Sequence, residues 1–279
     1  MQISFCNGND KEYQRKLNHL LKDIFFDFTF WYDLNLWDQN YESYSIEKDN
    51  QIISNICIFK TQMFFRGKQY PALSIGAVAT KSEYRGKGFS RMLMEHIIKK
   101  HDDLPMYLSA NENVIDFYPK FGFKRVYEKL PVSAYAIHND IASKPLRFDS
   151  EKLRHYIYNR QNIHQSLDCL NAASINLFHI FYGNLKTHIY DIPELETIVI
   201  AKQNGTTLNL IGVFSLKEIA FADLAKHLPF ANIQKIEFGF MPYWDDLQYE
   251  MIEYNADPFF VRGGTCEIGD FKFPELALT

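Results

Sequence analysis

The sequence has no apolar run that approaches the roughly 18 residues needed to cross a bilayer. Its opening residues, MQISFCNGNDKEYQRK, are too polar for a secretory signal peptide. The four cysteines, Cys6, Cys57, Cys169 and Cys266, lie far apart and form no CxxC pair, which disfavours structural zinc and a disulfide framework. We therefore expect a cytoplasmic protein with no metal and no membrane partner.

The chain also lacks an excess of basic residues. Its 30 Lys and Arg stand against 34 Asp and Glu, which gives a formal net charge of −4. A general nucleic-acid binder is usually basic overall, so we expect no nucleic-acid partner. A local basic patch at Arg85, Lys87 and Arg91 is still compatible with one anionic ligand. With 279 residues, 47% of them hydrophobic, the chain can form two domains with separate cores.

Hydrophobic periodicity predicts an α+β protein, an α/β sandwich in which helices flank a sheet. In the N-terminal half we expect helices over 9–26, 90–100 and 111–120, and strands over 44–47, 52–65, 70–80, 105–110, 123–130 and 132–137 that form one sheet. A polar linker over 138–150 divides the chain into domains of residues 1–138 and 139–279. In the second domain we expect helices over 151–180 and 216–227, a hairpin over 197–215, a strand over 233–240, and a helix or turn over 244–254.

The most informative segment is SIGAVATKSEYRGKGFSRMLMEHIIKK, residues 74–100. It passes from a β-prone strand through a basic turn into an amphipathic helix. Backbone N–H groups in such a turn point at one spot, with the positive end of the helix dipole behind them. Glycine at positions 86 and 88 lets the backbone approach a phosphate closely. The segment predicts a diphosphate site, and the full spacing of a nucleoside-triphosphate loop is absent.

Two motifs carry a resemblance to a known family. Arg85, Gly88 and Ser90 fill a phosphate-loop signature, and Asn111, Tyr118 and Gly122–Phe123 fill a second signature downstream. Together they resemble the GNAT acyltransferase superfamily over about residues 44–130. The resemblance implies a central mixed, mostly antiparallel sheet flanked by helices. The total length and the tail over 273–279 are also similar to Eis-type acetyltransferases, in which an active GNAT domain precedes a second, degenerate GNAT-like domain.

The resemblance implies acetyl-CoA as the acyl donor. The turn and its helix would bind the pyrophosphate, and the exposed backbone of the preceding strand would pair with the pantetheine amides. The cofactor-binding residues expected on this basis are Val78, Ala79, Thr80, Arg85, Gly86, Lys87, Gly88, Phe89, Ser90 and Asn111.

Tyr118 is the candidate general acid, because a phenol can donate a proton to the leaving thiolate. A core tyrosine is the alternative, and Pro119 could re-aim the side chain. The general base is not identifiable from the residues alone. The resemblance implies the α-carboxylate of Thr279 as a candidate, and a frayed surface terminus is the alternative.

These expectations combine into an N-acetyltransferase that acts on a primary amine of a small molecule or peptide. An acyl-CoA-binding sensor or scaffold without turnover is the alternative, and the oligomeric state is left open. The aromatic stretch over 25–37 also permits two interpretations, a core-packing segment or the wall of an acceptor pocket.

Overall fold

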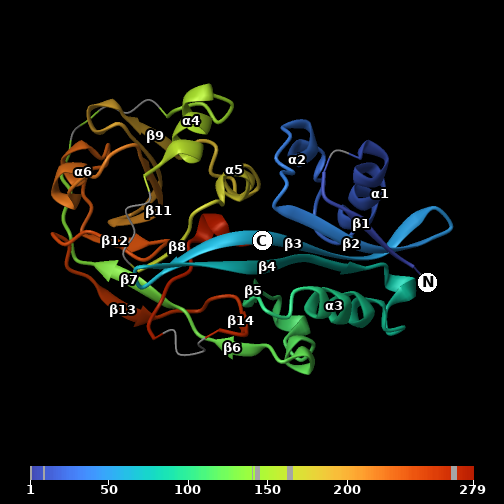
Figure 1. The fold of residues 1–279 in the computed structure, drawn as a ribbon. Coiled ribbons are helices and arrows are strands. Elements are labelled where there is room, and N and C mark those ends of the chain that lie inside the picture. Colours follow the sequence, from blue (N-terminus) through green and yellow to red (C-terminus); the bar gives the residue numbers. More distant parts are fainter. Residues whose placement is uncertain (1, 9, 140, 142–144, 162–165, 265–268) are drawn as a thin grey trace.

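The computed structural model describes residues 2–8, 10–139, 141, 145–161, 166–264 and 269–279. Within these residues the chain forms two sheets with helices packed against them, which confirms the α+β prediction (Figure 1). None of the described helices is long and apolar enough to span a membrane.

The first sheet is mostly antiparallel, in the order β1-β2-β3-β4-β5-β14-β6, with β8 paired to β3. Among the described strands of this sheet, only β4 and β5 pair in parallel. The helices α1 and α2 lie on one face of this sheet and α3 lies on the other (Figure 1). The strands are β1 (Ile3–Cys6), β2 (Tyr41–Lys48), β3 (Gln51–Phe65), β4 (Lys68–Thr80), β5 (Met106–Ser109), β6 (Lys124–Val126), β8 (Leu167–Cys169) and β14 (Phe259–Arg262); the helices are α1 (Lys11–Leu21), α2 (Thr29–Asp33) and α3 (Phe89–Lys100).

The second sheet has the order β13-β7-β12-β11-β10-β9. Its strands are β7 (Lys129–Ser133), β9 (Ile189–Ile192), β10 (Thr197–Asn204), β11 (Thr207–Ser215), β12 (Lys235–Phe238) and β13 (Glu250–Glu253). The helices of this half are α4 (Glu151–Asn159), α5 (Ala173–Tyr182) and α6 (Phe221–His227). The hairpin predicted about Asn204–Gly205 is confirmed, with Asn204 opposite Thr207.

The two sheets exchange strands across the boundary predicted at residue 138. β14 comes from the end of the chain and lies between β5 and β6 of the first sheet. β7 comes from the first half and pairs with β12 and β13 of the second sheet. The expectation that residues 132–137 close the first sheet is therefore wrong. The division into residues 1–138 and 139–279 stays a proposal, and the linker proposed over 138–150 lies partly outside the described residues.

Two predicted helices are also wrong. The span 151–180 contains β8 between α4 and α5, because Asp168 and Cys169 sit in a strand that pairs with β3. The span 111–120 forms two short 3₁₀ turns, η2 (Glu112–Val114) and η3 (Tyr118–Phe121). Pro119 lacks a backbone N–H and disfavours the α conformation before it, which explains why a continuous helix does not form. In the span 244–254, residues 250–253 form β13, so the chain there is partly strand.

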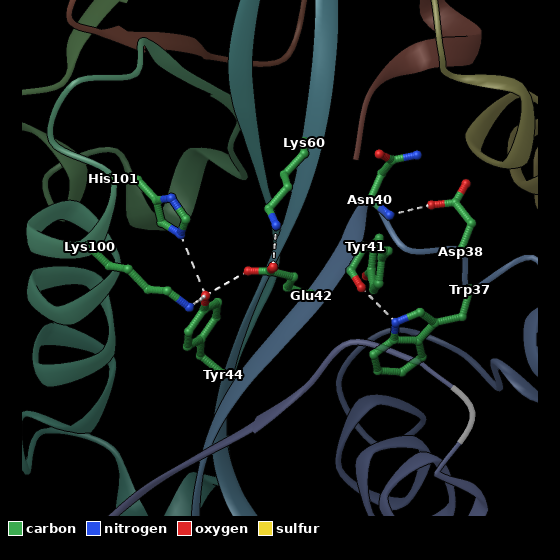
Figure 2. A network of polar contacts seen from close by, with 9 residues as sticks. All are labelled: Trp37, Asp38, Asn40, Tyr41, Glu42, Tyr44, Lys60, Lys100 and His101. Carbon is green, nitrogen blue, oxygen red and sulfur yellow. Dashed lines mark hydrogen bonds and ion pairs between the residues drawn. The ribbon is translucent and has the colours of Figure 1, made fainter.

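A polar network holds the C-terminal end of α3 against β2 (Figure 2). Lys100 Nζ donates to the hydroxyl of Tyr44 at 2.7 Å, and that hydroxyl donates to Glu42 Oε2 at 2.6 Å. Lys60 forms an ion pair with the same carboxylate. Along α3, Leu93, Met94 and Ile97 are buried against the same sheet. These contacts fix the axis of α3, and therefore the direction in which its N-terminus points.

Candidate active site

One large cavity, of about 860 Å³, opens where β4 and β5 separate. The two strands pair in parallel only at Leu73 with Met106 and Ser74 with Tyr107. Beyond Ser74, β4 has no paired strand on that side within the described residues. Its end then lines one side of the cavity, and Ser109 and Ala110 line the other. The splayed strands thereby leave a backbone edge free to pair with an extended ligand.

A β-bulge shapes this edge of β4. On the neighbouring strand, Asn55 pairs with Ala79 and Cys57 pairs with Gly76, so Ile56 faces two residues of β4. One of these, Ala77, has a φ of 46°, which is uncommon for a residue with a side chain. The buried Asn55 side chain holds it by donating from Nδ2 to the Ala77 carbonyl oxygen at 3.1 Å. Val78, Ala79 and Thr80, predicted to bind the cofactor, all line the cavity.

The basic turn lies at one end of the cavity. The φ angles of Gly86 and Gly88 are 73° and 82°, and Gly88 directly precedes α3. Within the described part of the chain, no N–H from residue 86 to residue 91 donates to a backbone or side-chain acceptor. These N–H groups form a cradle that fits a phosphate, with the positive end of the α3 dipole beside it.

The side chains around this turn have different roles. Arg85 and Ser90 line the cavity, and the Ser90 hydroxyl lies 2.7 Å from that of Thr80. Lys87 turns away, because its Nζ donates to the Glu83 carbonyl oxygen at 2.8 Å. The residues 86–89 do not themselves line the cavity, so their predicted contribution rests on backbone N–H groups. Asn111 lines the cavity on the opposite side.

Tyr118 is nearly buried, at 5% exposure, and lines the cavity. Its ring contacts Phe117, Phe123 and Phe260, with the last ring centroid at 5.5 Å. Burial raises the pKa of Tyr118 to about 12. The hydroxyl has no hydrogen-bond partner among the described residues, so it is available to a ligand. The ring of Tyr118 is therefore packed as in a core tyrosine, and the residue also lines the cavity, as the predicted general acid would have to do.

Thr279 also lines the cavity, beside β4. A Cβ built on Gly76 would lie 2.9 Å from the main-chain carbon of Thr279, so only glycine allows this approach. The Thr279 hydroxyl is hydrogen-bonded to the hydroxyl of Ser74. The terminal residue is thus docked between the splayed strands, not frayed at the surface.

Helix α5 of the second half holds this tail. Asn176 Nδ2 donates to the Leu276 carbonyl oxygen at 2.7 Å, and His179 Nε2 donates to that of Leu278. Burial lowers the pKa of His179, which keeps the imidazole neutral. Upstream, the Glu275 N–H donates to the Gly239 carbonyl oxygen at 2.8 Å.

The aromatic stretch divides between the core and the cavity, and its role as an acceptor wall stays a prediction. Trp31 and Tyr32, on α2, and Trp37, after it, are buried in the core. Phe25 and Phe26, before α2, are exposed at 46% and 39% and line the cavity. No group of three or more metal-ligating side chains is found among the described residues.

The structure brings Tyr118, Thr279 and the β4 edge to one cavity, and their catalytic and binding roles stay predictions. Sequence reasoning missed Gly76, Ser74, Asn176 and His179, which place the tail. His179 lies on a helix with no ligand spacing around it, so no local pattern could identify it. Cys266 lies outside the described residues, and Cys6, Cys57 and Cys169 are free and buried.

Comparisons with known proteins agree with this geometry. The family model described as the acetyltransferase (GNAT) domain matches residues 18–126. Three solved structures share the fold over both halves of the chain. A conserved protein of Enterococcus faecalis V583 described as a probable N-acyltransferase has a TM-score of 0.59 at 18% identity, covering 94% of this chain and 73% of that one. No curated protein sequence matches significantly.

The other two structures are similar to this chain at lower identity. A GCN5-related N-acetyltransferase from Kribbella flavida has a TM-score of 0.58 at 13% identity, covering 93% of this chain and 70% of that one. Eis1 from Mycobacterium abscessus has a TM-score of 0.58 at 13% identity, and the match covers 94% of this chain and 73% of that one. The chain thus shares the fold of these structures over both of its halves. Residues 18–126, the part that matches the acetyltransferase (GNAT) domain, contain the basic turn and Tyr118.

Proposed function

We propose that the protein transfers an acetyl group from acetyl-CoA to a primary amine of a small-molecule or peptide acceptor, by direct attack of the amine on the thioester. The observation that carries this proposal is the single cavity lined by the β4 edge, Arg85, Ser90, Tyr118 and Thr279. At one end of the cavity, the backbone N–H groups of residues 86–90 suit a diphosphate. Further along, the cavity is lined by Tyr118, which can donate a proton, and by Thr279.

In this proposal the backbone of residues 78–80 pairs with the pantetheine arm, and the N–H groups of residues 86–90 bind the pyrophosphate. Arg85 adds a positive charge near the phosphates, and its Nε donates to the Thr80 carbonyl oxygen at 3.2 Å. Asn111 lines the cavity across from this strand and is proposed to contact the donor as well. A Cβ at position 88 would meet no atom within 4 Å, so the approach of the phosphates is unobstructed there.

Two groups of this chain move protons. For a chain that ends at Thr279, the α-carboxylate accepts a proton from the incoming ammonium, which frees the nitrogen lone pair to attack the carbonyl carbon. As the carbon–sulfur bond breaks, the Tyr118 hydroxyl donates its proton to the sulfur, where negative charge accumulates. The nitrogen, which after the attack carries two hydrogens and a positive charge, gives one proton back to the Tyr118 oxygen. A pKa of about 12 keeps this phenol protonated at neutral pH. The products are an amide and a free thiol.

The test is calorimetry with acetyl-CoA followed by a thiol-release screen of amines. Gly88→Glu should abolish acetyl-CoA binding, because it brings a carboxylate to the phosphate cradle. Gly67→Glu is the matched control: Gly67 has a similar φ of 78°, also meets no atom within 4 Å, and lies in the β3–β4 turn outside the cavity lining. Unchanged binding to the Gly88 variant would refute the phosphate site.

Acetyl-CoA binding with no thiol release for any acceptor would favour the alternative, a sensor or scaffold without turnover. We further propose that the reaction takes place in the cytoplasm, a location compatible with the free thiols of Cys6, Cys57 and Cys169.

A further inference from the structure

Beyond Thr279, the cavity ends in an aromatic wall. Phe25, Phe26, Phe28 and Trp31 come from the segment around the start of α2, and Phe178 comes from α5. The ring centroids of Phe26 and Phe28 are 4.6 Å apart, and those of Phe28 and Phe178 are 5.7 Å apart. Trp31 meets Phe178 edge-on at 5.5 Å. Both halves of the chain therefore contribute to this wall.

This wall carries no acidic side chain. Among the described residues that line the cavity there is no Asp or Glu, and the positive Arg85 lies at the opposite, phosphate end. Asp27 stands between two wall residues in sequence but does not line the cavity. Its carboxylate accepts from Thr29 Oγ1 at 2.6 Å and from Asn18 Nδ2 at 2.9 Å. For a chain ending there, the terminal carboxylate of Thr279 is then the only anion that the described lining residues offer at this end of the cavity.

Resting on the proposed function, we propose that the acceptor is an arylalkylamine, a monoamine with an aromatic body, and not a polycation. One ammonium can pair with the Thr279 carboxylate while the aromatic body packs on the rings of Phe26, Phe28 and Phe178. Offset and edge-to-face ring pairs add stabilisation beyond that of area burial. A second or third ammonium would lose its hydration against an apolar wall with no partner.

The test measures binding of three amines by calorimetry, with no acetyl-CoA needed: 2-phenylethylamine, n-butylamine and spermidine. We expect 2-phenylethylamine to bind roughly tenfold or more tighter than n-butylamine, because the ring adds buried area and ring contacts. Spermidine should bind most weakly. Similar affinities for the three amines, or a preference for spermidine, would overturn the inference.

A pair of variants tests the wall directly. Phe26→Ala should weaken binding of 2-phenylethylamine by roughly fivefold or more and leave n-butylamine nearly unchanged. Phe5→Ala is the matched control, since Phe5 has a similar exposure of 45% and lies on β1, outside the cavity lining. Thermal unfolding of both variants checks that the fold is retained. Equal effects of the two substitutions would also overturn the inference.

The outcomes separate this inference from the proposed function. If acetyl-CoA binds and polyamines are acetylated while arylalkylamines do not bind, the inference fails and the acetyltransferase proposal stands. If arylalkylamines bind at the wall but no acetyl group is ever transferred, the acetyltransferase proposal fails and the binding site stands.

Discussion

Gly76→Ala tests whether the position of the last residue controls turnover. The added methyl carbon would lie 2.9 Å from the main-chain carbon of Thr279 and 3.2 Å from its Cβ. Carbon atoms prefer roughly 3.5–4.0 Å, so strand or tail must move by about 0.6–1 Å. β4 is hydrogen-bonded to β3 at this point, where Gly76 pairs with Cys57, so the tail is the part that yields.

The energies support displacement without unfolding. Overpacking of this kind costs about 1–3 kcal/mol. That is comparable to the one or two hydrogen bonds, at about 1 kcal/mol each, that hold Leu278 and Thr279 to His179 and Ser74. A shift of about 1 Å in a catalytic group can lower the rate by about 10²-fold. We therefore expect kcat to fall by roughly that factor, with little change in acetyl-CoA affinity.

The assay is steady-state thiol release with an accepted amine, together with calorimetry for acetyl-CoA. Gly8→Ala is the control, since a Cβ there meets no atom within 4 Å. Removing Thr279 should lower kcat to a similar extent, and adding Gly76→Ala to that shortened chain should cost little more. A wild-type kcat for Gly76→Ala would refute the reasoning. So would a full additional loss in the shortened chain, because the damage would then lie in β4 itself.

Three other substitutions probe the remaining parts of the site. Tyr118→Phe should lower kcat by roughly 10²–10⁴-fold with acetyl-CoA affinity unchanged, and near-wild-type turnover would exclude it as the acid. Asn55→Ala removes the donor to the Ala77 carbonyl and should weaken acetyl-CoA binding severalfold by calorimetry, because the bulge relaxes; an unchanged dissociation constant would contradict this. Burial lowers the pKa of His179 in the folded protein. As the pH falls below about 6.5, the unfolded chain therefore binds a proton at His179 before the folded protein does, and the free energy of unfolding should decline. His179→Gln should show a smaller decline in melting temperature between pH 7 and 5; an identical pH dependence would contradict the assignment.

The parts of the site that were predictable have local patterns. The strand, turn and helix over residues 74–100 are encoded by apolar alternation, two glycines and an amphipathic stripe, and the structure forms β4 and α3 there. The resemblance carried by the second motif implied a place for Tyr118 in the site, and the structure puts this residue on the cavity. Its local geometry did not, because Pro119 replaces the expected helix with 3₁₀ turns.

The parts that were not predictable depend on contacts between distant residues. The pairing of Val261 with Tyr107 joins residues from the two halves of the sequence, and the four-residue strand β14 carries no sign of its partner. Likewise, the bond from His179 to the Leu278 carbonyl joins an ordinary-looking helix to the tail. Such contacts follow from how the sheets assemble, which hydrophobic periodicity does not encode.

The exchange of strands between the two sheets has a consequence for the order of biosynthesis. β14 completes the first sheet between β5 and β6, and the tail that follows it reaches the cavity. Both belong to residues 259–279, so a nascent chain that has emerged only through residue 138 holds the basic turn and Tyr118 but exposes unpaired edges on β5 and β6. Such edges favour association with other chains. The first sheet is therefore completed only once Phe259–Arg262 of the C-terminal half can pair with β5 and β6, which makes the fold of the N-terminal half dependent on the C-terminal one.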